Sequence, residues 1–80
     1  MLVFNVMARR FPPPWTVEEL DACFVVRDDN GQPLAYVYFE DEPGRRSAAK
    51  LLSKDEARRI AVNIAKLPDL LRQVADELFA

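Results

Sequence analysis

Residues 28–33 (Asp-Asp-Asn-Gly-Gln-Pro) constrain the fold of this chain more than any other segment. They separate two runs, residues 22–27 and 34–40, that are rich in β-branched and aromatic side chains. Such runs favour β-strands. An Asn-Gly pair between two strands favours a tight hairpin because both residues tolerate a positive φ. The sequence therefore predicts an antiparallel hairpin near its centre.

Two turns compete at this hairpin. A two-residue type I′ turn on residues 30–31 pairs Phe24 with Val37. A type I turn on residues 29–30, with Gly31 in the left-handed region, shifts that register by one. In either register one face, predicted to meet the core, holds Ala35, Val37 and Phe39, and the wetter face holds Tyr36 and Tyr38.

The segment after the hairpin is compatible with either a strand or a helical turn. Residues 42–45 (Glu-Pro-Gly-Arg) fit a type II turn, with proline at the second position and glycine at the third. Residues 46–52 are then predicted to form a third antiparallel strand. Their alanines leave a helical turn as the alternative.

The C-terminal part predicts helix. Ser53 and Glu56 form a capping box, in which each residue accepts a hydrogen bond from the backbone N–H of the other. Pro68 interrupts the apolar pattern that follows, so we expect helices over about residues 54–66 and 68–78. The pattern recurs at intervals of three and four residues through Ala57, Ile60, Ile64, Leu67, Leu71, Val74 and Leu78.

The predicted fold class is α+β: a two- or three-stranded antiparallel β-meander followed by a C-terminal helix kinked or split at Pro68. Eighty residues suffice for one small domain, expected over residues 11–80, after an extended or frayed segment over residues 1–10. Residues 11–15 (Phe-Pro-Pro-Pro-Trp) are expected to cover one edge of the core, or alternatively to bind an aromatic groove. The predicted core is Phe24, Val26, Ala35, Val37, Phe39, Ile60, Ile64 and Leu67, with Trp15 closing an edge.

The residue types argue against an enzyme. The chain has no histidine, so the commonest general base and the usual Ser–His and Cys–His nucleophiles are missing. Cys23, the only cysteine, lies among apolar residues and is interpreted as a small buried hydrophobe. No zinc-ligand spacing and no glycine-rich phosphate loop is present, and the acidic residues at the turns do not follow a calcium-loop pattern. We expect no catalytic residue, no metal and no cofactor.

The apolar runs are too short for a membrane span, which needs about 18 residues or more. Residues 1–8 are apolar but lack the basic start and the longer apolar run of a signal peptide. We therefore expect a cytoplasmic protein without a membrane partner. Met7 is an alternative start to Met1.

Five runs along the chain together form a family-like pattern. They are Phe-Pro-Pro-Pro-Trp from 11, Glu-Leu-Asp-Ala-Cys-Phe-Val-Val-Arg-Asp to 28, Leu-Ala-Tyr-Val-Tyr-Phe-Glu from 34, Pro-Gly-Arg-Arg-Ser-Ala-Ala-Lys-Leu-Leu from 43 and Asp-Glu-Ala-Arg-Arg-Ile-Ala from 55. In these runs the chain resembles a family of small proteins from alphaproteobacteria, over about residues 9–71. No function is assigned to that family, so the resemblance implies a short cytosolic protein and carries over no site residue. A looser likeness of architecture, a small sheet followed by a helix, extends to the AP2-like and integrase-arm DNA-binding domains.

Two functional hypotheses follow. The first is a small non-catalytic protein-interaction or regulatory module that binds an unidentified protein, or itself, through its C-terminal helix. The alternative is a nucleic-acid-binding domain that uses the basic block at residues 45–59, whose net charge is +4 in a chain of net charge −2. The candidate interaction residues are Leu71, Val74, Leu78 and Phe79, and the candidate nucleic-acid residues are Arg45, Arg46, Lys50, Arg58 and Arg59.

The predicted third strand divides this basic block. On a strand, Arg46 and Lys50 share one face and point away from the helix. Arg58 and Arg59 then lie on the outer side of the helix, on the opposite surface. The block is expected to form two modest groups unless residues 46–52 are helical.

Overall fold

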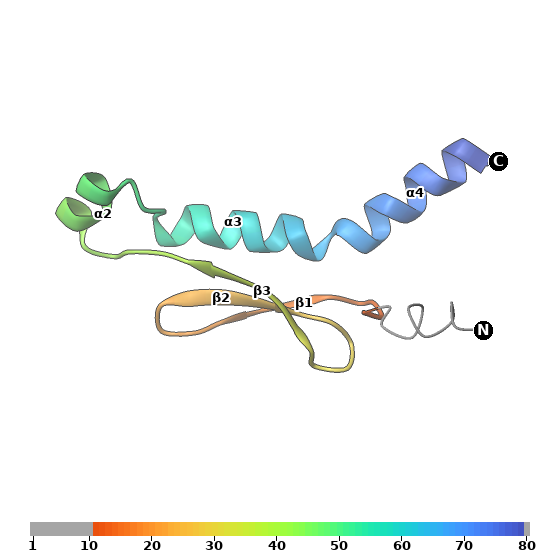
Figure 1. Ribbon diagram of the computed structural model, residues 1–80, viewed down its shortest axis with the longest axis horizontal. Coiled ribbons are helices and arrows are strands. Elements are labelled where there is room, and N and C mark those ends of the chain that lie inside the picture. The colour runs from red at the N-terminus through yellow and green to blue at the C-terminus, as the bar shows by residue number, and fades with distance from the viewer. Residues whose placement is uncertain (1–10, 80) are drawn as a thin grey trace, which may run out of the picture.

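The computed structural model describes residues 11–79, with side chains up to residue 73. Three strands form one antiparallel sheet in the order β1-β2-β3, and α3 lies along one face of it (Figure 1). The α+β fold predicted from the sequence, a β-meander followed by helices, is confirmed. The elements are β1 (Thr16–Glu19), β2 (Cys23–Arg27), β3 (Pro33–Tyr38), α2 (Pro43–Ala49), α3 (Lys54–Ala65) and α4 (Leu67–Phe79).

The hairpin between β2 and β3 combines the two predicted alternatives. Its turn is the longer one: the N–H of Gly31 donates to the carbonyl of Asp28 at 3.0 Å, and Gly31 has a φ of +86°. Its register is nevertheless that of the shorter turn, with Phe24 opposite Val37. A register shift between Val26 and Arg27, which leaves Leu34 of β3 as the extra residue, absorbs the one-residue difference between them.

Asp28 holds this turn with its buried side chain. Its Oδ1 accepts hydrogen bonds from the backbone N–H groups of Asn30 and Gln32, both at 2.9 Å. These bonds satisfy two backbone donors of the turn, which is the usual role of aspartate at the start of a turn.

The third strand comes from a different part of the chain than predicted. Thr16–Glu19 pairs with β2, whereas residues 43–49 form helix α2. For residues 46–52, the strand is therefore wrong and the helical alternative is confirmed up to Ala49. The type II turn predicted at residues 42–45 is also absent. The Glu42 side chain instead accepts from the N–H groups of Gly44 and Arg45, and caps a helix whose first residue is proline.

The core lies between α3 and the sheet. Ala57 and Ala61 are fully buried against Phe24, Val26 and Val37. Two alanines on the contact face let the helix approach the sheet closely, so the larger residues of α3 lie beside the contact and not within it. Partly buried residues around this core are Trp15, Val17, Ala35, Phe39, Leu52, Ile64 and Ala65.

Two residues predicted for the core lie outside it. Ile60 keeps 41% of its surface exposed and Leu67 keeps 39%. The sequence pattern placed the bulky residues on the buried stripe. In the structure, α3 is instead rotated about its axis so that Ala57 and Ala61 face the sheet.

Among the described helices, none packs on the sheet face opposite α3. Tyr36 and Tyr38 are exposed there and stack with 6.4 Å between their ring centroids, as predicted for the wetter face. Between β1 and β3 on the same face, Val25 is completely buried. Arg27 and Glu18 form a 3.0 Å ion pair on this face. Directly paired residues of adjacent strands share a face, so Glu18 and Tyr36 flank Val25 on its two sides.

Helices α3 and α4 are separated at Lys66, two residues before Pro68, which confirms the predicted split. Helix α4 continues past the end of the sheet and bends away from it (Figure 1). Among the described elements it packs only against α3. Within the described residues, no helix has both the length and the apolar character needed to cross a bilayer.

Candidate interaction surface

Exposed apolar side chains follow one another from the middle of α3 into α4. Ile60 and Leu67 are joined there by Leu70, which is 46% exposed, and Leu71, which is 62% exposed. We call these four residues the α3–α4 strip. Soluble monomers do not usually gather exposed large apolar side chains in this way, and such patches commonly mark an interaction site.

The candidate interaction residues all fall on α4. Leu71 is exposed, as an interaction residue must be. Val74, Leu78 and Phe79 continue the same helix, and their side chains lie outside the described part. Sequence reasoning missed Ile60 and Leu67 as surface residues because their spacing also fits a buried stripe.

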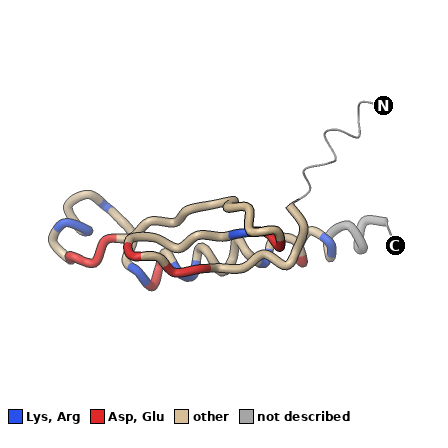
Figure 2. The backbone as a smooth tube through the Cα atoms, turned by 90° about the horizontal axis from the view of Figure 1, so that it is seen from below, with Lys and Arg blue, Asp and Glu red and all other residues tan. Residues whose placement is uncertain are grey.

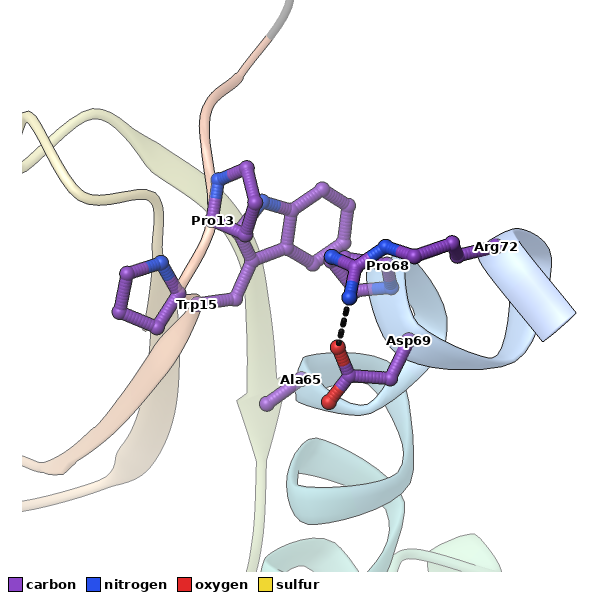
Figure 3. A pocket seen from close by; sticks show the side chains of 7 residues that line it. Pro13, Trp15, Ala65, Pro68, Asp69 and Arg72 are labelled. Carbon is purple, nitrogen blue, oxygen red and sulfur yellow. Dashed lines mark ion pairs between the residues drawn. The ribbon is translucent and has the colours of Figure 1, made fainter.

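A hollow of about 330 Å³ lies where the proline segment meets the break between α3 and α4. Figure 3 shows the Trp15 ring pointing toward Pro68 and Arg72 across it. The indole N–H donates to the carbonyl of Phe11 at 2.8 Å, and Arg72 forms a 3.6 Å ion pair with Asp69. Its walls are mostly proline and tryptophan rings, and they contain no pair of groups suited to acid–base chemistry. The lining residues are Pro13, Pro14, Trp15, Ala65, Pro68, Asp69 and Arg72.

The candidate nucleic-acid residues do not form one free basic surface. Arg45, Arg46 and Lys50 belong to α2 and its C-terminal cap, and Arg58 and Arg59 belong to α3. The prediction that Arg46 and Lys50 point through the far side of the sheet is wrong, because neither residue lies on a strand. Figure 2 shows acidic and basic segments next to each other at the α2 end of the molecule.

Three of these five candidate residues, Arg45, Arg58 and Arg59, form ion pairs with carboxylates. Arg46 donates to the backbone carbonyl of Glu40 at 3.1 Å. Lys50 ends α2 with a left-handed backbone (φ 57°) and has no ion pair within the described residues. The ion pairs are Arg45–Glu40 at 3.6 Å, Lys54–Glu19 at 2.7 Å, Arg58–Asp55 at 2.5 Å and Arg59–Asp55 at 2.8 Å.

Both shifted pKa values have structural causes at the start of α3. The hydrogen bond and charge of Glu19 raise the pKa of Lys54. The pKa of Glu56 is lowered, first by the hydrogen bond from the Ser53 backbone N–H and then by that from the Ser53 side chain. The predicted capping box is confirmed, with Ser53 N donating to Glu56 Oε1 at 2.8 Å and Glu56 N donating to Ser53 Oγ at 3.1 Å. The capping-box hydrogen bonds that lower the pKa of Glu56 also satisfy backbone donors at the start of α3.

Cys23 is buried in β2, in agreement with its interpretation as a small hydrophobe. Among residues 11–79 no group of three or more acidic or sulfur ligands comes together as a metal site would require. A comparison with family models, curated proteins and solved structures finds no match to this chain. The function is therefore argued from the structure alone.

Proposed function

We propose that this protein is a small non-catalytic protein-interaction module that binds through the α3–α4 strip. The observation that carries the proposal is the exposure of Leu67, Leu70 and Leu71 on a helix that packs on no strand of the described sheet. Leaving three leucines partly in water costs free energy that binding a protein surface would recover, at about 25 cal/mol for each Å² of apolar area covered.

The nucleic-acid alternative has less support. Four of the six basic side chains in residues 45–59 already contact carboxylates, and the pI of the chain is about 5.0. Phosphate binding would have to compete with these ion pairs. A gel shift with random DNA at low salt tests this alternative, since nonspecific binding is strongest there.

Photo-crosslinking in the producing cell tests the proposal directly. A crosslinking amino acid at Leu71 should yield a covalent adduct with a protein. The same group at Gln73, which is also exposed but polar and outside the strip, should yield much less. If position 71 gives no more adduct than position 73, the strip is not a binding surface.

A further inference from the structure

We propose that the α3–α4 strip binds the same strip of a second copy of this chain. In this dimer the segment formed by α3 and α4 runs antiparallel to the same segment of the partner copy. This inference rests on the proposed function and names its partner. Three observations support it: the distribution of charge along α3 and α4, the spacing of their apolar side chains, and the exposure of one flank of α3.

Charge is divided between the two halves of this helix pair. Residues 54–66 contain four basic and two acidic side chains, a net charge of +2. Residues 67–79 contain one basic and three acidic side chains, a net charge of −2. A parallel arrangement would place halves of like charge side by side. An antiparallel arrangement places each +2 half along a −2 half of the partner.

The apolar residues are compatible with the same antiparallel arrangement. When two copies are related by a twofold axis that passes beside Lys66, Ile60 lies opposite Leu71 of the partner copy. Ile64, which adjoins the strip and is itself half-buried against the core, then lies opposite Leu67 of the partner copy. The same surface therefore serves both copies, as a twofold interface requires. The opposed positions alternate at intervals of four and three residues, the spacing of antiparallel helix packing.

Within the described residues, the flank of α3 that carries Ile60 is partly exposed, with 41% of the Ile60 surface accessible. At 100° per residue, Lys54 and Ala65 lie on one side of the buried Ala57–Ala61 line and Ile60 lies on the other. Lys54 contacts Glu19 of β1, and Ala65 lines the hollow beside Trp15. The β1 strand and the proline segment therefore cover the side of α3 away from Ile60.

The size of the chain gives such pairing a physical advantage. A domain of about this length buries only some 60% of the surface that its unfolded chain exposes, so its own core is small. A second copy can cover the exposed strip with apolar area of its own, because both copies carry the same residues there. Because exposed charges are screened over a Debye length of about 8–10 Å, salt should weaken the preference for one orientation.

Sedimentation of the full chain at increasing concentration tests the pairing. We expect a monomer–dimer equilibrium that Leu71→Glu shifts strongly toward monomer. Gln73→Glu is the matched control, since it adds the same charge at an exposed position outside the strip and should not shift the equilibrium toward monomer. Leu71 is mostly exposed, so the variant should keep its far-ultraviolet circular dichroism and melting midpoint at a concentration where both proteins are monomeric.

Opposite substitutions at position 73 test the orientation. Antiparallel pairing predicts that Gln73→Glu tightens the dimer and Gln73→Lys weakens it, each by about two- to fivefold. Parallel pairing predicts the reverse signs, because position 73 would then lie along a half of its own charge. Reversed signs would therefore overturn the proposed arrangement.

Disulfide trapping gives an independent measurement of orientation. In a Cys23→Ala background, the chain carrying both Ile60→Cys and Leu71→Cys should form a covalent dimer on mild oxidation. Either single cysteine should form one poorly, because a disulfide needs Cβ atoms about 3.5–4.5 Å apart. Efficient dimerisation of the Leu71→Cys chain alone would overturn the antiparallel arrangement.

The two proposals fail in different ways. A strictly monomeric chain whose position 71 crosslinks to another protein would overturn the self-pairing and leave the interaction function standing. A monomer that gives no adduct at position 71 would overturn both. A dimer unaffected by Leu71→Glu would place self-association on a different surface and overturn the present inference.

Discussion

The contact between α3 and the sheet can be tested by enlarging Ala61. This residue is fully buried and faces Phe24 and Val26, so Ala61→Leu adds three carbons where the structure has no room. Overpacking of this kind costs about 1–3 kcal/mol in the free energy of unfolding. At about 4–8 °C per kcal/mol for a domain of this size, the melting midpoint should fall noticeably.

A second substitution makes the test sharper. Ile60→Ala removes three carbons worth about 0.8 kcal/mol each when buried, but only 59% of the residue is covered (100% minus the exposed 41%). The expected loss is therefore about 1.4 kcal/mol, with no cavity contribution at a site open to solvent. Had the isoleucine stripe formed the core, Ile60→Ala would instead cost about 2–5 kcal/mol.

Urea unfolding followed by circular dichroism, at one fixed protein concentration, measures both values. The fixed concentration matters because self-association adds to the apparent stability. Asn63→Leu is the matched control, since it places the same side chain on the exposed side of α3. If Ala61→Leu is as stable as the wild type, or if Ile60→Ala costs well above about 2 kcal/mol, in the range expected for a buried isoleucine, the assignment of the buried face is wrong.

Three further predictions concern the local structure. Asp28→Ala should cost about 1–3 kcal/mol by leaving the Asn30 and Gln32 N–H groups without an acceptor, whereas Asp28→Asn should cost less; chemical denaturation compares them. Gly31→Ala should cost about 1–2 kcal/mol because of the positive φ, and Gly31→Asn should be milder; equal melting midpoints would contradict the turn geometry. The lowered pKa of Glu56 means that its stabilisation is fully present above the ordinary glutamate pKa of about 4.3 and is lost as pH falls through the lowered value. Glu56→Gln should reduce this acid dependence, and unchanged pH curves would count against the capping box.

The hairpin and the helices were predictable because local chemistry decides them. Asn30-Gly31 fixes the turn region, Ser53 and Glu56 fix the start of α3, and Pro68 ends one helix and begins the next. Even there, sequence reasoning treated turn and register as linked choices. The register shift between Val26 and Arg27 makes the turn type independent of the strand register, and the strand sequences carry no signal for this shift.

The third strand and the buried face of α3 depend on tertiary contacts. Residues 16–19 (Thr-Val-Glu-Glu) carry a weak strand signal, and pairing with β2 determines their conformation. Residues 46–52 were misassigned because Pro43 was interpreted as a turn residue, although proline is equally suited to the first turn of a helix. On α3, both the isoleucines and the alanines follow a helical period, and only the closeness of the helix to the sheet selects the alanines.

The position of β2 has a consequence for how the domain opens. This strand contacts β1, β3 and α3, and its residues from Cys23 to Val26 are all buried, whereas α4 contacts only α3 among the described elements. Amide hydrogen exchange should therefore be graded, with the β2 amides exchanging only through global unfolding and those of α4 through local fraying. A protease should accordingly cut within α4 while the rest of the domain remains folded. A bound partner would then slow that cleavage without changing the exchange of β2.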